Sequence, residues 1–301
     1  MLEENFKSGF VAIVGRTNVG KSTLLNALLG KKLAIMSEKP QTTRNKILGV
    51  LNRPGAQIIF LDTPGFHKPK HRLGEHLVQV ATKTLREVDA VLFLVEALEP
   101  PGPGDEYVIR ELKELKTPVL LVINKIDLVK KEELIPLIEI YSRRSIFAEI
   151  VPVSAKKGEN LDRLVEVLVS YLPEGPRYYP EDMVTDRPES FIMAELIREK
   201  VLLLTSQEVP HAVAVVVEET EERPSGVLAV RAVIYTERES QKGILIGKGG
   251  QMLKKIGQLA REEIEALFGT KVYLELWVKV REDWRNRENF LVSFGYAEKK
   301  K

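Results

Sequence analysis

The chain of 301 residues contains no cysteine, which excludes disulfides and thiolate metal sites and is typical of proteins from a reducing compartment. It has no apolar run approaching the ~20 residues of a membrane-spanning helix, and its first seven residues do not resemble a secretory signal. Its four histidines show no metal-ligand spacing. These absences favour a cytoplasmic protein without a membrane span of its own.

An excess of charge of one sign is also missing. The 45 basic and 43 acidic residues leave a net charge of +2 at pH 7. Overall charge therefore cannot hold a nucleic acid, and any such binding requires a local basic patch. The length of the chain and its 44% hydrophobic content are sufficient for two cores.

The strongest motif is Gly15-Arg-Thr-Asn-Val-Gly20-Lys21-Ser22, which has the spacing GxxxxGK[ST]. It follows an apolar run at 10–14 and precedes a helix-like stretch at 21–29, so a strand, a tight loop and a helix are predicted. Such a loop directs backbone N–H groups at phosphates, while the lysine adds charge and the serine hydroxyl suits Mg²⁺. The predicted nucleotide contacts here are Gly15, Asn18, Val19, Gly20, Lys21, Ser22 and Thr23.

A second motif, Asn124-Lys125-Ile-Asp127, follows the apolar run at 119–123. The Asp127 carboxylate is expected to accept hydrogen bonds from N1–H and the exocyclic amine of guanine, a donor pair that adenine lacks. A further strand at 149–153 leads to Ser154, Ala155 and Lys156, whose amides are expected near the guanine O6. The two motifs together predict a site for GTP and GDP.

The segment Asp62-Thr63-Pro64-Gly65 follows another apolar run, at 58–61. Asp62 is expected to hold Mg²⁺ through water, and the Gly65 amide is expected to meet the γ-phosphate. Either Thr42 or Thr43 is expected to be a second Mg²⁺ ligand beside Ser22, with Thr43 favoured. Segments 38–46 and 62–74 are therefore predicted to order around the γ-phosphate and to loosen after hydrolysis.

Position 66 carries phenylalanine, which cannot orient a water molecule as the glutamine of Ras-like proteins does. Slow intrinsic hydrolysis is predicted, or help from another group. Asn18 either helps to hold a monovalent cation such as K⁺ against the phosphates or only shapes the loop; the sequence leaves both readings open. The predicted catalytic residues are Lys21, Thr43, Gly65 and Asn18.

A stretch rich in proline, glycine and charge at 173–188 separates this pattern from a second one. The second pattern has the order helix, strand, strand, helix, Gly247-Lys-Gly-Gly250, helix, strand. Five basic residues against one acidic residue at 238–257 form the required basic patch. A GxxG loop between helices brings bare backbone close to single-stranded RNA. The predicted RNA contacts are Lys242, Ile246, Gly247, Lys248, Gly249, Gly250, Lys254 and Lys255.

The chain resembles the Era family of ribosome-assembly GTPases through its motifs at 15–22, 40–44, 62–70 and 246–250. Thr17 is one departure, since proline is expected there in this family. The resemblance implies an α/β P-loop GTPase domain with a mostly parallel sheet at 1–172, a linker at 173–188, and an α+β type II KH domain with a C-terminal helical extension at 189–301.

The resemblance further implies a monomer that binds single-stranded 16S rRNA near its 3′ end and acts in maturation of the small ribosomal subunit. It also implies a peripheral association with the inner membrane. Two other functions remain open from the residues: a non-catalytic RNA-binding scaffold with GTP as a structural ligand, and a GTPase of tRNA modification. The second of these does not explain the GxxG domain.

Overall fold

The computed structural model describes residues 5–37, 39, 42–66, 69, 71–297, which form two compact units. Most of the first unit is the N-terminal part of the chain up to Asp186, and the second unit contains the chain from Arg187 onward. Two stretches from the N-terminal part, Ile35–Thr42 and Pro69–His76, also belong to the second unit. This division differs from the expected domains, in which both stretches fell in the first.

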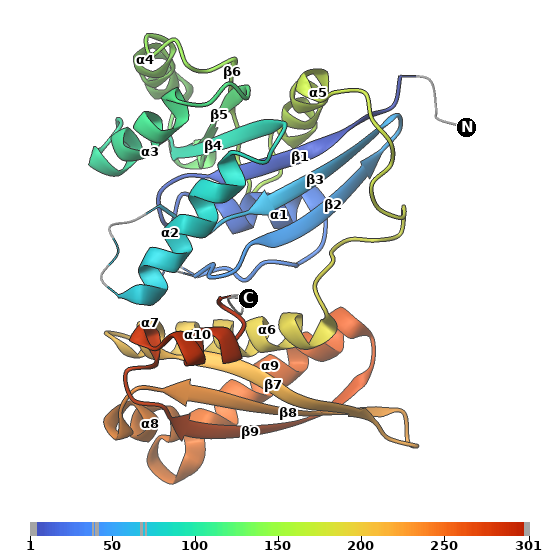
Figure 1. Ribbon diagram of the computed structural model, residues 1–301, viewed down its shortest axis with the longest axis vertical. Coiled ribbons are helices and arrows are strands. Elements are labelled where there is room, and N and C mark those ends of the chain that lie inside the picture. Colours follow the sequence, from blue (N-terminus) through green and yellow to red (C-terminus); the bar gives the residue numbers. More distant parts are fainter. Residues whose placement is uncertain (1–4, 38, 40–41, 67–68, 70, 298–301) are drawn as a thin grey trace. The chain divides into compact units, whose positions relative to one another are not determined.

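The first unit is built on a six-stranded sheet in the order β2-β3-β1-β4-β5-β6 (Figure 1). Strand β2 is antiparallel to β3, and the other neighbours are parallel. Apolar runs become strands here because both sheet faces are covered; every residue of β3 is buried. The strands are β1 (Lys7–Val14), β2 (Ile47–Arg53), β3 (Ala56–Asp62), β4 (Ala90–Glu96), β5 (Val119–Asn124) and β6 (Glu149–Pro152).

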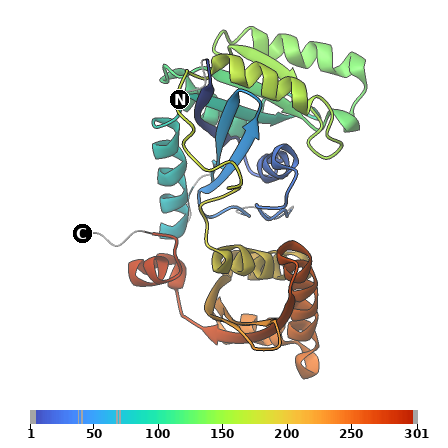
Figure 2. The same ribbon diagram turned by 90° about the vertical axis from the view of Figure 1, so that its right-hand side faces the viewer.

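Helices cover both faces of this sheet, and Figure 2 shows α1 (blue) and α2 (cyan) on opposite sides of the strands. Apolar side chains of α2, α3 and α4 form one continuous core with the sheet. The parallel strands carry the predicted nucleotide motifs at their carboxyl ends, where open α/β sheets bind ligands. The helices are α1 (Lys21–Leu29), α2 (Arg72–Leu85), α3 (Pro103–Lys113), α4 (Lys131–Ser142) and α5 (Leu161–Tyr171), with the 3₁₀ turn η1 (Ile126–Leu128).

The predicted linker packs along the first unit. Tyr178 and Tyr179 each donate a backbone N–H to the Gln57 side chain, at 2.8 and 3.0 Å. Val50 of β2 donates its N–H to the Val184 carbonyl at 2.8 Å. Residues up to Asp186 therefore belong to the first unit, because buried Gln57 and strand β2 satisfy their backbone groups.

The second unit has a three-stranded sheet in the order β7-β8-β9, antiparallel between β7 and β8 and parallel between β8 and β9. Helices α6 and α9 pack on the sheet and share its apolar core. Strand β7 begins three residues later than the predicted 211, since residues 209–212 form a helical turn that has Pro210 at its second position. The elements are α6 (Glu189–Leu204), α7 (Val209–Ala212), β7 (Ala214–Glu222), β8 (Val227–Thr236), α8 (Glu239–Ile246), η2 (Lys248–Gly250), α9 (Gln251–Phe268), β9 (Lys271–Val280), η3 (Trp284–Asn286) and α10 (Glu288–Ser293).

Among the helices of the described residues, none combines the length and the hydropathy needed to cross a bilayer.

The two tryptophans have different environments. Trp284 is fully buried, donates its Nε1–H to the Ala212 carbonyl at 2.8 Å and stacks on Tyr296. Trp277 on β9 is 54% exposed. Trp284 is therefore a packing residue of the second unit, whereas Trp277 is not.

Replacing Trp284 with alanine is expected to lower the free energy of unfolding of the second unit by about 3–5 kcal/mol. The substitution opens a cavity and leaves the buried Ala212 carbonyl without its donor. Urea denaturation followed by far-ultraviolet circular dichroism measures the change. Trp277→Ala is the matched control and is expected to cost less than about 1 kcal/mol; equal losses in the two variants would contradict the packing role.

Candidate functional site

The loop after β1 has the backbone that a phosphate site requires. Gly15 has φ +153°, and a Cβ there would lie 2.5 Å from the Leu94 carbonyl oxygen. Gly20 has φ +97°, and a Cβ there would collide with the Asn124 side chain. Both positions therefore require glycine. Helix α1 begins directly after this loop, so its N-terminal amides and positive dipole end face the same place.

Lys21 is buried at the start of α1, and its Nζ donates to the carbonyls of Arg16 at 2.8 Å and Gly15 at 3.3 Å. Burial lowers the pKa of Lys21 to about 8, although the Asp62 carboxylate opposes this shift. Burial raises the pKa of Asp62 to about 6, opposed by Lys21 and by hydrogen bonds from Ser22 and Thr43. The two charges are thus held inside the protein at the predicted phosphate and metal position.

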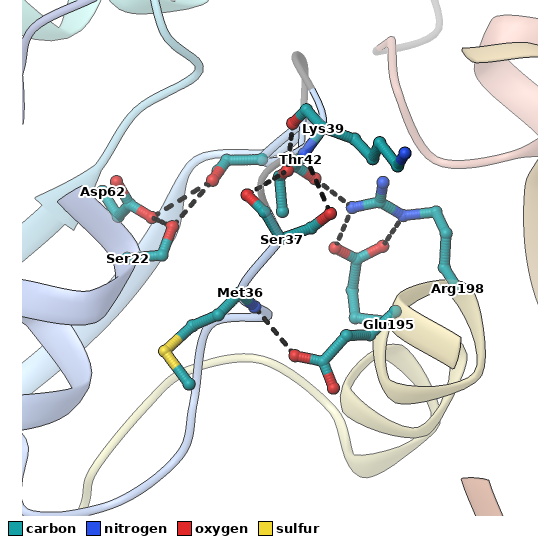
Figure 3. Close-up of polar contacts among 10 residues, drawn as sticks. Ser22, Met36, Ser37, Lys39, Thr42, Asp62, Glu195 and Arg198 are labelled. Atoms are coloured by element: carbon teal, nitrogen blue, oxygen red, sulfur yellow. Dashed lines mark hydrogen bonds and ion pairs between the residues drawn. The ribbon is translucent and has the colours of Figure 1, made fainter. Parts of the chain in front are cut away.

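Three oxygen-bearing side chains converge near Lys21, and Figure 3 shows the contact between two of them, Ser22 and Asp62. Ser22 Oγ donates to Asp62 Oδ2 at 2.8 Å, and Ser22 Oγ and Thr43 Oγ1 are 3.0 Å apart. Thr43 Oγ1 also lies 3.4 Å from Asp62 Oδ2. Asp62 Oδ1 is buried and has no hydrogen-bond partner among the described residues. This hard-oxygen set with an unused carboxylate oxygen fits Mg²⁺.

The Thr42 hydroxyl turns away from this cluster. It donates to the Lys39 carbonyl at 2.6 Å and lies 3.4 Å from the Ser37 carbonyl (Figure 3). Of the two threonines left open by the sequence, Thr43 is the one in contact with Ser22 and Asp62. Residues 38, 40–41, 67–68 and 70 of the two predicted switch segments lie outside the described residues.

Asn124 holds the phosphate loop and the predicted base-binding loops together. Its Nδ2 donates to the Val19 carbonyl at 2.9 Å, and its Oδ1 accepts the Ala155 N–H at 3.0 Å. Ser154 Oγ donates to Asp127 Oδ1 at 2.6 Å, which orients the carboxylate at the end of β5. The buried amide of Asn124 therefore braces the site.

The Lys125 side chain runs back toward the phosphate loop, where its Nζ donates to the Asn18 carbonyl at 3.0 Å and to Glu96 at 2.7 Å. Glu96 was missed by the sequence analysis. Its position at the end of β4, the strand beside β5, is the signal that indicates it. Asn18 is exposed and has φ +68°. Lys156 is exposed in the base-binding loop, and Thr23 lies in the first turn of α1.

Other predicted residues lie at the site but direct their side chains elsewhere. The Thr63 hydroxyl donates to the Ile13 carbonyl at 3.0 Å, and Val19 is fully buried, so these residues offer backbone groups. A Cβ at Gly65 would lie 3.1 Å from Lys21 Nζ, which places the 64–65 backbone beside the ammonium. Phe66 is buried against Tyr107 and belongs to the core.

In the second unit, the GxxG segment turns sharply between α8 and α9. Gly247, Gly249 and Gly250 all have positive φ, and a Cβ at Gly247 would lie 2.7 Å from the Met252 Cβ. The exposed Lys248 stands within this turn. The backbone is therefore free of side chains at the position where the sequence predicts RNA contacts, between two helices that fix its position.

A groove of about 530 Å³ lies between α9 and β9, next to this turn. Its walls combine apolar side chains with Lys254 and Arg261, which suits unstacked bases and a phosphate backbone. Lys242 pairs with Glu239 at 3.6 Å, while Ile246 ends α8 and Lys255 is exposed on α9. The sequence analysis missed the β9 side; the groove residues it did not name include Gln258, Arg261, Tyr273, Leu274 and Leu276.

Comparisons with known proteins match both units of the chain. A family model described as 50S ribosome-binding GTPase matches residues 10–125, and a KH domain model matches residues 208–285. The GTPase Era of Heliobacterium modesticaldum is 59% identical over 296 residues, covering 98% of this chain and 99% of that protein.

Two solved structures are similar over nearly their whole length. One is Era in complex with MgGDPNP and nucleotides 1506–1542 of 16S ribosomal RNA, and the other is a tyrosine-to-alanine variant of Aquifex aeolicus Era bound to GDP and aluminium fluoride. Each is 49% identical, with a TM-score of 0.94, and covers 97% of this chain and 99% of the other.

Asp127→Asn is expected to weaken GDP binding by about 2–4 kcal/mol, since an amide cannot accept both guanine donors. Xanthine offers a carbonyl in place of the exocyclic amine, so the variant is expected to prefer xanthosine diphosphate. Calorimetric titration with both nucleotides measures this. Asp162→Asn, on the exposed surface of α5, is the control, and unchanged guanine preference in the first variant would contradict the role of Asp127.

Proposed function

The chain belongs to the Era family of GTPases, and on that premise we propose that it couples GTP hydrolysis to binding of the single-stranded 3′ end of 16S rRNA during maturation of the small ribosomal subunit. One observation carries this proposal: a relative with 49% identity and a TM-score of 0.94 holds both MgGDPNP and nucleotides 1506–1542 of 16S ribosomal RNA. The same match covers both units of the chain and so favours this function over tRNA modification or a non-catalytic scaffold.

In this function the chain binds GTP at the loop after β1. Lys21 faces the β- and γ-phosphates, and the Gly65 amide faces the γ-phosphate. Ser22 and Thr43 would hold Mg²⁺ directly and Asp62 through water, a proposal supported by their mutual contacts and the unused Asp62 oxygen. Bound Mg²⁺ supplies positive charge that neutralises the triphosphate.

The chain positions the reacting groups without a water-orienting glutamine. Phe66 is buried and offers no hydrogen bond to a water molecule, so intrinsic hydrolysis is slow in this proposal. Asn18 in the phosphate loop would help to hold K⁺ against the phosphates and so supply a second neutralising charge. The exposure of Asn18 at the loop surface supports this role.

Turnover of GTP is expected to be about tenfold faster in K⁺ than in Na⁺ at equal ionic strength, since a charge placed on the transferring phosphoryl group accelerates phosphoryl transfer. Phosphate release under saturating GTP measures both rates. Asn18→Gly suits the positive φ at this position and removes the amide, so it is expected to abolish the difference. Equal rates for the unaltered chain in the two salts would contradict K⁺ binding.

The RNA would lie across the GxxG turn and into the groove between α9 and β9. Lys248 stands beside the bare glycine backbone and Lys254 lines the groove, which places positive charge along the path of a nucleic-acid backbone. The apolar groove residues give unstacked bases a surface to pack on. Binding to the small subunit, a monomeric state in the cytoplasm and peripheral contact with the inner membrane follow from the family resemblance as parts of this proposal.

Lys248→Ala and Lys254→Ala are each expected to weaken binding of a single-stranded 16S rRNA 3′-end oligonucleotide about tenfold and to reduce the slope of log K against log salt by about 0.7. Fluorescence anisotropy across a salt series measures both quantities. Lys279→Ala is the control, since this lysine pairs with Glu218 on β7 and does not line the groove. An equal loss in the control would point to overall charge rather than to the groove.

A further inference from the structure

Helix α6 carries three buried charged residues among apolar ones: Glu195, Arg198 and Glu199, with Arg198 fully buried. They are three and four positions apart, so they lie on one face of the helix. Burying charge costs free energy, and a buried ion pair is weak evidence for a purely stabilising role. The contacts of this helix face therefore indicate whether the buried charges have a role other than stabilisation.

Arg198 and Glu195 form a bidentate pair (Figure 3). Arg198 Nε and Nη2 donate to the two Glu195 oxygens at 2.7 and 2.6 Å. Burial alone would lower the pKa of Arg198, but the Glu195 carboxylate keeps it raised, so the guanidinium is charged. The same Nη2 also donates to the backbone carbonyl of Thr42. The Arg198 guanidinium thus binds a carboxylate and a main-chain oxygen at the same time.

The other end of the same stretch is anchored as well. Met36 donates its backbone N–H to Glu199 Oε1 at 2.8 Å (Figure 3), and Lys200 pairs with Glu199 at 2.8 Å. Ile35 is 1% exposed and belongs to the apolar core of the second unit. Residues 35–36 and 42 are therefore held by α6 within the second unit, although they precede β2 of the first in sequence.

Thr43, the next residue, belongs to the first unit and contacts Ser22 and Asp62. The peptide group between residues 42 and 43 is planar, so a hydrogen bond that fixes the Thr42 carbonyl also fixes the direction of the Thr43 N–H and Cα. The chain passes from one unit to the other at this peptide. The hydrogen bond from Arg198, 155 positions further along the chain, therefore acts on the peptide plane that leads into Thr43.

We propose that Arg198, held by Glu195, is a positioning residue that sets the Thr42–Thr43 peptide and thereby the affinity of the site for Mg²⁺ in the GTP state. The proposal rests on the proposed function, in which Thr43 is a Mg²⁺ ligand. GDP lacks the γ-phosphate around which this segment orders, so GDP binding does not require the contact. Coupling is reciprocal: occupancy of Thr43 by Mg²⁺ stabilises the contact of Thr42 with α6.

The test is the double variant Glu195→Met/Arg198→Met, which removes the pair without leaving a lone buried charge. The Mg²⁺ concentration for half-maximal GTP hydrolysis is expected to rise about tenfold and the rate at fixed Mg²⁺ to fall accordingly, while GDP affinity stays within about twofold. Glu237→Met/Arg285→Met is the matched control, because it removes another partly buried pair of the second unit at a place away from residues 35–42. That control is expected to leave the Mg²⁺ requirement unchanged.

Thr43→Ala separates this inference from the proposed function. If it leaves the Mg²⁺ requirement unchanged, the role of Thr43 in the proposed function is wrong. If it raises the requirement and the Glu195/Arg198 double variant does not, the positioning role of Arg198 is wrong. If both raise it, the variant that combines all three substitutions is expected to raise the Mg²⁺ requirement by less than the product of the two separate fold-changes. The reason is that both sets of substitutions act through Thr43.

Arg198→Lys covers the case in which the double variant does not fold. Lysine keeps the charge but lacks the planar guanidinium that donates to Glu195 and to the Thr42 carbonyl at the same time. It is expected to raise the Mg²⁺ requirement about threefold. A variant with a lower melting temperature and an unchanged Mg²⁺ requirement would show a merely structural pair and overturn the proposal.

Discussion

The arrangement on which the nucleotide site depends is the burial of Lys21 and Asp62 as opposite charges at the ends of neighbouring elements. Burial lowers the pKa of Lys21 to about 8 and raises the pKa of Asp62 to about 6, and each charge opposes the shift that burial imposes on the other. A buried charge pair is costly unless it is satisfied, and a triphosphate with Mg²⁺ is the ligand that complements both members. The strands and the glycine turns serve to hold these two groups in place.

Much of this site was predictable because its parts are local. The glycine, lysine and serine of the phosphate loop, the aspartate at the end of β3 and the aspartate after β5 all follow apolar runs that are typical of buried strands. The sequence favoured Thr43 over Thr42 but left both open, since the choice depends on which hydroxyl the fold turns toward Ser22. Glu96 escaped notice for the same reason: its contact with Lys125 follows from strand order rather than from a motif.

The division of the chain into two units was also only partly predictable, because it too depends on contacts between distant residues. A composition rich in proline and glycine marks residues 173–188 as a connection, but buried Gln57 fixes part of that stretch to the first unit. Residues 35–42 look like an ordinary loop between α1 and β2, yet Ile35 and two main-chain groups are held by α6. Contacts between positions more than 150 residues apart leave no periodicity for a sequence analysis to detect.

The parallel pairing of β8 with β9 determines when the groove between α9 and β9 can form. Strand β9 forms one wall of that groove and joins the sheet only after α8 and α9 have crossed over. Chains fold from the N-terminal side during synthesis, and pairing of distant strands is slow. During synthesis the chain therefore completes its phosphate loop well before the groove between α9 and β9 can form.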